Sequence, residues 1–197
     1  MAHAPAAAVI GTRFWTVPVA RAVVALVPAA LITFNANHSA QFGLLVFGAF
    51  ALVSGLVIAG LSWLTVRDAR DRTLFVLQGV VGVVAGVLAL LLNAGGLGFF
   101  LYLVSVWAAV TGMLELFAGI RLRARDRTAR NQVARDLLIV GIFTAVLALT
   151  FLLLPPHAVV SVGLLGAYLA IVGVYLAIAG VDARRGLASS STDSDTP

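Results

Sequence analysis

The sequence has no cysteine, no lysine and few charged residues of any kind. The absence of cysteine excludes disulfides, thiol catalysis and thiolate metal sites. Charged residues make up only 11% of the 197-residue chain, whereas soluble domains contain about 25%. So few charges could not cover the surface of a soluble fold. Together with the 61% hydrophobic content, this makes the lipid bilayer the expected surroundings of the chain.

The sequence also lacks the motifs of the common catalytic sites. It has no Walker motif, no HExxH, no GxSxG and no Ser/His/Asp set that could assemble. We therefore expect no enzymatic activity, no cofactor and no metal site. The net charge of +5 comes from arginines that stand beside apolar stretches and form no separate basic domain, so nucleic-acid binding is not expected either.

Six apolar stretches follow one another along the chain. Each comes close to the roughly 20 residues that a helix needs to cross a bilayer. They predict an all-α membrane domain over residues 13–185, between a flexible N-terminus (1–12) and a polar, disordered C-terminal tail (186–197). The six predicted spans are residues 15–34, 42–64, 74–93, 97–120, 136–154 and 158–181.

Arginine is found on alternate connections between these stretches. Around 35–41, 93–98 and 155–157 the connections contain no Arg, Asp or Glu. The arginines stand at Arg13, within 66–73, within 121–136, and at Arg184 and Arg185. Cytoplasmic loops of membrane proteins carry an excess of such residues. We therefore expect a multi-pass protein of a bacterial inner membrane with both termini in the cytoplasm.

An internal repeat relates the six stretches. Ala22, Gly79 and Gly141 follow one another at 57 and 62 residues, and Phe50 precedes Trp107 by 57. The repeat predicts three helical hairpins of one orientation, about 14–66, 73–123 and 135–185, with a pseudo-threefold axis along the membrane normal. It also pairs the first stretch with the third and fifth, which argues against a cleaved signal peptide.

This layout resembles the HdeD family of bacterial membrane proteins, over roughly residues 14–185. Arg21-Ala22 and Gln78-Gly79 match the motif that opens a hairpin, whereas Val140-Gly141 keeps only its glycine. Pro155 matches the proline of the family's turns, which the first two turns lack. The resemblance implies a membrane protein of the acid-resistance type. It supplies no catalytic residue that could be carried over to this chain.

Two charged residues lie inside apolar stretches. Glu115 is the only carboxylate well inside one, and Arg21 is the only arginine there. Arg21 follows Trp15 by six residues and Glu115 precedes Arg121 by six, so both lie about 9 Å inside the cytoplasmic end. Gln78 stands at a similar depth, and the three could meet in one polar layer.

Three interpretations of this layer stay open. The first is a proton-sensitive or solute-contacting pair, because ionisable groups inside a membrane are costly and often functional. In the second, Arg21 and Glu115 form a structural ion pair that holds the first helix to the fourth. In the third, each side chain reaches interfacial water separately.

Histidines and aromatic residues give weaker predictions. His38 and His157 lie in the predicted outer turns, where they are either external pH sensors or incidental. Trp63 stands near a cytoplasmic helix end, where an interfacial anchor is expected. We expect Phe50, Trp107 and Tyr168 to pack in the core around the pseudo-symmetry axis.

Three functions are compatible with these observations. The first is a non-enzymatic membrane protein of the HdeD type in acid or envelope stress tolerance. The second is a small transporter or channel for protons or a small solute, and the third is an accessory subunit of a membrane complex. The expected partner is the bilayer, with a second copy or another membrane protein as further candidates. Small residues four apart, such as Gly82 and Gly86, favour close helix packing within the bundle or between copies.

Overall fold

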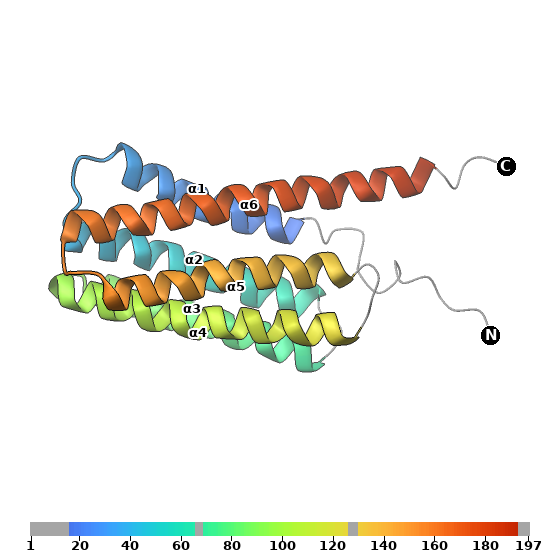
Figure 1. Cartoon of the computed structure of the whole chain (residues 1–197), viewed down its shortest axis with the longest axis horizontal. Coiled ribbons are helices and arrows are strands. Elements are labelled where there is room, and N and C mark those ends of the chain that lie inside the picture. Colours follow the sequence, from blue (N-terminus) through green and yellow to red (C-terminus); the bar gives the residue numbers. More distant parts are fainter. Residues whose placement is uncertain (1–15, 66–68, 126–129, 193–197) are drawn as a thin grey trace.

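The chain forms a bundle of six antiparallel helices in the part that the structure describes (Figure 1). This computed structural model describes residues 16–65, 69–125 and 130–192. The predicted all-α class is confirmed, while the predicted flexible N-terminus (1–12) lies outside the described residues. The helices are α1 (Thr16–Phe34), α2 (Ala40–Thr65), α3 (Ala69–Leu91), α4 (Gly96–Arg125), α5 (Arg130–Leu153) and α6 (Ala158–Thr192).

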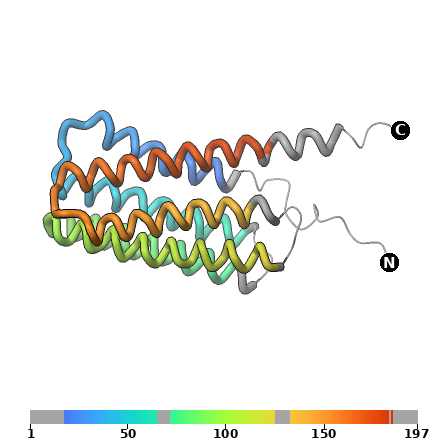
Figure 2. The backbone as a smooth tube through the Cα atoms, viewed as in Figure 1, coloured from blue at the N-terminus to red at the C-terminus, as the bar shows by residue number. Residues whose placement is uncertain are grey.

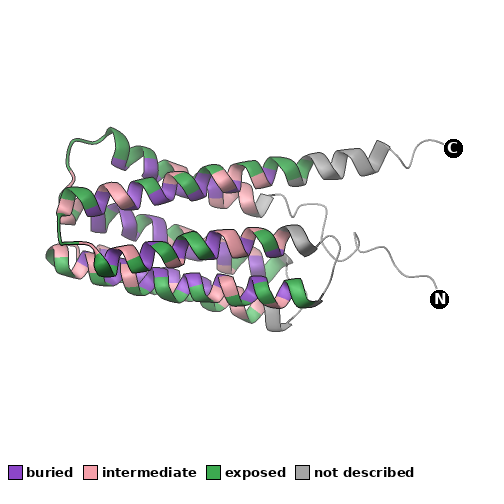
Figure 3. Ribbon diagram, viewed as in Figure 1, coloured by how far each residue is buried: buried purple, intermediate pink, exposed green. Residues whose placement is uncertain are grey.

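Five of these helices are long and apolar enough to cross a membrane, namely α2 to α6. In α1 the apolar part that could be assessed is shorter, Pro18–Phe34. Exposed positions run along the outside of the bundle (Figure 3). Many of them carry large apolar side chains, including Phe34 at 88% exposure and Leu64 at 81%. Water would not tolerate such a continuous apolar surface, and lipid would, so the chain is a multi-pass membrane protein.

The structure corrects several predicted boundaries. Helices α3, α4 and α5 continue beyond their apolar stretches into the Arg-rich connections, α4 as far as Arg125. Helix α6 reaches Thr192, so residues 186–192 are helical where a disordered tail was predicted. Extending an existing helix adds a hydrogen bond per residue and needs no new nucleus. That is why polar residues that would not start a helix can prolong one.

Three short turns lie at one end of the bundle, which we call the turn end (Figure 2). They connect α1 to α2, α3 to α4 and α5 to α6. Helix α1 begins and α6 ends at the opposite end, which we call the Arg-rich end (Figure 1). Arginines outside the apolar spans or at their borders stand there, among them Arg72, Arg121, Arg123, Arg135 and Arg184.

The most extensive packing is not between helices that share a turn. It joins α2 to α3, α4 to α5, and α1 to α6. The first and last helices are therefore neighbours, and the bundle closes on itself. Helix α2 also contacts α4 and α6. Each of these three helices follows one of the short turns, and these contacts place them toward the centre of the bundle.

Apolar side chains fill the bundle toward the turn end. Trp107 meets Phe47 and Phe50 edge to face, with ring centroids 5.3 Å and 5.7 Å apart. Phe100 and Phe151 form another such pair at 5.8 Å. The largest fully buried apolar side chains are Phe47, Phe100, Ile32, Leu44, Leu165, Leu169, Val104, Val140 and Val162. The predicted packing of Phe50, Trp107 and Tyr168 in the core agrees with their burial.

Glycines let the backbones of α2 and α3 touch. A Cβ on Gly55 would lie 2.5 Å from the carbonyl oxygen of Gly79, and a Cβ on Gly79 would lie 2.7 Å from that of Gly55. A Cβ on Gly86 would lie 2.5 Å from the amide nitrogen of Leu52. Because lipid supplies no hydrophobic drive between helices, such close backbone contact is a main source of association.

Substitution at this seam should therefore destabilise the bundle. We expect Gly55→Ala to lower the free energy of unfolding by about 1–3 kcal/mol, because the neighbouring atoms are rigid backbone. Thermal unfolding in detergent micelles, followed by circular dichroism, measures the loss. Gly60→Ala on the same helix is the matched control, since nothing lies within 4 Å of its new Cβ. Equal effects of the two substitutions would contradict the close contact.

Candidate functional site

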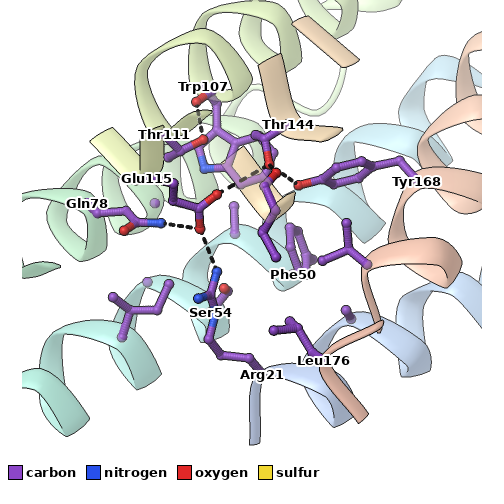
Figure 4. A pocket seen from close by; sticks show the side chains of 17 residues that line it. Arg21, Phe50, Ser54, Gln78, Trp107, Thr111, Glu115, Thr144, Tyr168 and Leu176 are labelled. Atoms are coloured by element: carbon purple, nitrogen blue, oxygen red, sulfur yellow. Dashed lines mark hydrogen bonds and ion pairs between the residues drawn. The ribbon is translucent and has the colours of Figure 1, made fainter. Parts of the chain in front are cut away.

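The candidate site is centred on the carboxylate of Glu115, the only glutamate in the sequence. Glu115 lies on α4 and its side chain is only 2% exposed. One oxygen, Oε1, accepts a hydrogen bond from Arg21 Nη2 at 2.7 Å and another from Gln78 Nε2 at 2.8 Å (Figure 4). Arg21 belongs to α1 and Gln78 to α3, so one oxygen atom joins three helices.

Two hydroxyl groups lie beyond the other carboxylate oxygen. Thr144 on α5 brings its Oγ1 within 3.5 Å of Glu115 Oε2. The same Oγ1 lies 2.8 Å from the hydroxyl of Tyr168 on α6. The network thus includes side chains from α1, α3, α4, α5 and α6.

The hydroxyl of Thr144 has one proton and several neighbours. Its best acceptor is the carbonyl oxygen of Val140, at 2.8 Å on the preceding turn of α5. Tyr168 can then donate to Thr144, also at 2.8 Å. With that proton used, the 3.5 Å contact leaves Glu115 Oε2 without a short donor, because O–H···O bonds measure about 2.5–3.0 Å. The two oxygens of Glu115 therefore differ sharply in their partners.

A cavity of about 30 Å³ adjoins this network. Fifteen of its seventeen lining residues fall into five sets of three, whose members are separated by 57 residues and then by 61 or 62. The sets are Arg21, Gln78 and Val140; Ala25, Gly82 and Thr144; Phe50, Trp107 and Tyr168; Ser54, Thr111 and Val172; and Ile58, Glu115 and Leu176. Most of these sets combine polar with apolar residues, so the chemistry of the cavity is asymmetric.

The structure brings together the three residues of the predicted polar layer. Arg21 and Glu115 contact each other directly, as the ion-pair interpretation required. Gln78 joins them through the same oxygen. The predictions did not include Thr144, and they treated Tyr168 only as a packing residue. The repeat offsets could have found Thr144, because it is the third member of the set that begins with Ala25.

The two predicted histidines lie away from this site, in the turns at the turn end. His38 Nδ1 is 3.4 Å from the carbonyl oxygen of Ala36, and the backbone N–H of His157 donates to the carbonyl oxygen of Pro155 at 2.9 Å. Their role as pH sensors stays a prediction. In the described part of the chain, no group of three His, Cys, Asp or Glu side chains is placed to hold a metal ion.

Two further contacts lie nearer the Arg-rich end. Tyr175 on α6 donates to Asp136 Oδ1 on α5 at 2.7 Å. The guanidinium of Arg72 stacks over the ring of Trp63 at 4.9 Å, and Trp63 is 65% exposed. An exposed aromatic ring at a helix end agrees with the interfacial position predicted for Trp63.

The pair of Arg21 and Glu115 should be strongly coupled. We expect Arg21→Leu to cost about 3 kcal/mol, because it leaves a buried carboxylate without its cation. Glu115→Leu should cost less, since Arg21 is 18% exposed and its long side chain can turn toward water. The double variant should lose less than the sum of the two. Reversible unfolding by a denaturing detergent measures all three, and strictly additive losses would contradict the coupling.

Comparison with known protein families supports the internal repeat seen in the sequence. Residues 20–91 and 77–134 each match the family described as a short repeat of unknown function, DUF308. The two matches begin 57 residues apart, which is the offset between Ala22 and Gly79. No curated protein and no solved structure matches the chain. The matched segments together cover more than half of the sequence, so the chain belongs to the DUF308 short-repeat family, which includes HdeD.

Proposed function

We propose that this protein is a non-enzymatic component of a bacterial inner membrane that serves acid or envelope stress tolerance. The observation that carries the proposal is the buried Glu115 network. Its charged groups bond to each other, and the largest buried side chains between it and the turn end are apolar. Membership in the family of HdeD supports the link to acid stress. A closed bundle of this kind acts on the membrane itself or on a partner, such as a second copy or another membrane protein.

We further propose that all six helices cross the membrane as three repeated hairpins around a pseudo-threefold axis. The five sets of cavity residues support this arrangement, because equivalent positions of three hairpins would surround a common axis. The packing of α2 on α3, α4 on α5 and α6 on α1 supports it as well. In each case the second helix of one hairpin meets the first helix of the next.

The same arrangement suggests the orientation of the protein. The Arg-rich end would face the cytoplasm, since arginine accumulates on that side of membrane proteins. Both termini would then be cytoplasmic, and the turns with His38 and His157 would face outward. The Glu115 network would lie in the inner half of the membrane.

Single cysteines can test this orientation cleanly, because the chain has none of its own. Ala94 in a turn and Ala124 at the end of α4 are both exposed. We expect a membrane-impermeant maleimide to label Ala94→Cys on intact cells and Ala124→Cys only after the membrane is permeabilised. The reverse pattern would place the Arg-rich end outside.

A transporter or channel for protons is the second candidate, because the cavity presents polar groups at the level of Glu115. A transport path would also have to cross the outer half of the bundle. There the largest buried side chains are apolar, with Phe47, Phe100 and Val104 at 0% exposure. The buried hydroxyl of Ser161 donates to the backbone carbonyl oxygen four residues earlier in the chain. This packing favours the non-transporting function.

Survival of cells after acid exposure tests the proposed function. Deleting the gene from its host should lower survival at low pH, and the wild-type chain should restore it. A well-folded Glu115→Gln variant that restores full survival would show that protonation of Glu115 is not needed. Survival that does not change on deletion would contradict the role in acid tolerance.

Purified protein in liposomes separates the two candidates. With a pH-sensitive dye inside, vesicles that contain the wild-type chain should respond to an external pH step like empty vesicles. Rapid acidification that Glu115→Gln abolishes would contradict the closed bundle and favour proton transport. The Gly60→Ala variant is a control for reconstitution, because it leaves the network untouched.

A further inference from the structure

The cavity beside Glu115 has the size and the electrostatic character of a site for a small neutral molecule. Its volume of about 30 Å³ has room for about two water molecules, since one needs about 10–15 Å³. The charged residues that line it are Arg21 and Glu115, which neutralise each other at 2.7 Å. A cation would be repelled by the guanidinium and an anion by the carboxylate, so neither fits as well as a neutral molecule.

The cavity offers an acceptor that needs a donor. Glu115 Oε2 belongs to a side chain that is 2% exposed, and among the described residues its one hydrogen bond comes from the hydroxyl of Thr144, at 3.5 Å. That hydroxyl donates its proton to the carbonyl oxygen of Val140, at 2.8 Å. A buried carboxylate oxygen without a close donor costs free energy, and Oε2 therefore requires a donor from within the cavity.

The cavity also offers donors that need an acceptor. Trp107 lines it, and its indole N–H makes no hydrogen bond to any residue that the structure describes. Where described, each fully buried polar side-chain atom has a partner, so the indole nitrogen, which has none, is not fully buried and adjoins unfilled space. The hydroxyl of Ser54, another lining residue, likewise makes no hydrogen bond to the described chain.

We propose that this cavity is a binding site for one or two ordered water molecules. One donates a hydrogen bond to Glu115 Oε2, and the indole N–H of Trp107 and the hydroxyl of Ser54 bond to the bound water. The site meets the two requirements for buried water, sufficient room and two to four polar partners. Water is both donor and acceptor, so it serves the carboxylate and the indole together.

This water site goes beyond the proposed role in stress tolerance and does not depend on it. It connects the Arg21–Glu115 pair on one side with the aromatic side chains around Trp107 on the other. The apolar packing of Phe47 and Val104 lies between it and the turn end. The water thus hydrates Glu115 within the bundle without forming a path across the membrane.

An experimental structure of the full chain, at a resolution that shows ordered water, tests the site directly. We expect a water peak within hydrogen-bonding distance of Glu115 Oε2 and a water acceptor for the indole nitrogen of Trp107. Three outcomes would overturn the proposal. They are a dry cavity, a protein donor within 3 Å of Oε2, and density for a larger ligand or an ion in place of water.

Tryptophan fluorescence supplies a second test in detergent or lipid. In a chain with Trp15→Phe and Trp63→Phe, all emission comes from Trp107, and an indole bonded to water emits at longer wavelength than a dry one. Ser54→Val removes a hydroxyl and fills the cavity with the kind of side chain that the repeat places at Val172. We expect it to move the emission to shorter wavelength.

Ser105→Val on α4 is the matched control, because Ser105 does not line the cavity. It should leave the emission where it is, and circular dichroism should show both variants folded. An unchanged emission in a folded Ser54→Val variant would contradict the water site, as would the same shift in both variants.

Discussion

The carboxylate of Glu115 joins helices that the glycine seams alone would leave unconnected. Backbone contacts such as that between Gly55 and Gly79 hold helices in pairs. Glu115 then links α4 to α1 through Arg21 and to α3 through Gln78, both by hydrogen bonds shorter than 3 Å. In a lipid environment an unpaired charge is costly, so the pairing forces these helices together in a single register.

Positions that follow the repeat and positions that depart from it have different consequences for the structure. Small residues such as Ala22, Gly79 and Gly141 recur at the repeat offsets and allow the same close packing three times. The charged side chains do not recur: Arg21 corresponds to Gln78 and Val140, and Glu115 corresponds to Ile58 and Leu176. A cavity lined by equivalent positions thereby becomes polar on one side only. Its asymmetry comes from side chains on a backbone arrangement that is itself repeated.

The bundle is built differently at its two ends. Toward the turn end, aromatic rings pack edge to face, Trp107 on Phe47 and Phe100 on Phe151, and the larger buried side chains are apolar. Toward the Arg-rich end, the Arg21–Glu115 ion pair, a tyrosine–aspartate hydrogen bond and a stacked arginine replace them. This difference favours a closed bundle with one hydrated site over a pore. Both proposals describe such a closed bundle.

The sequence by itself determined the helices, because length and apolar content are enough to identify a span, and it placed Arg21 and Glu115 at a common level along them. The tertiary structure decided which helices are neighbours. These helices are apolar on all sides, and lipid is as apolar as a protein core, so no polar face marks the side that turns inward. That choice of neighbours brings α1 against α6, places the hydroxyl of Thr144 beside Glu115, and leaves the cavity between the helices. The sequence also did not predict that the residues after Gly186 are helical. A helix that has already formed can continue through polar residues past its apolar part.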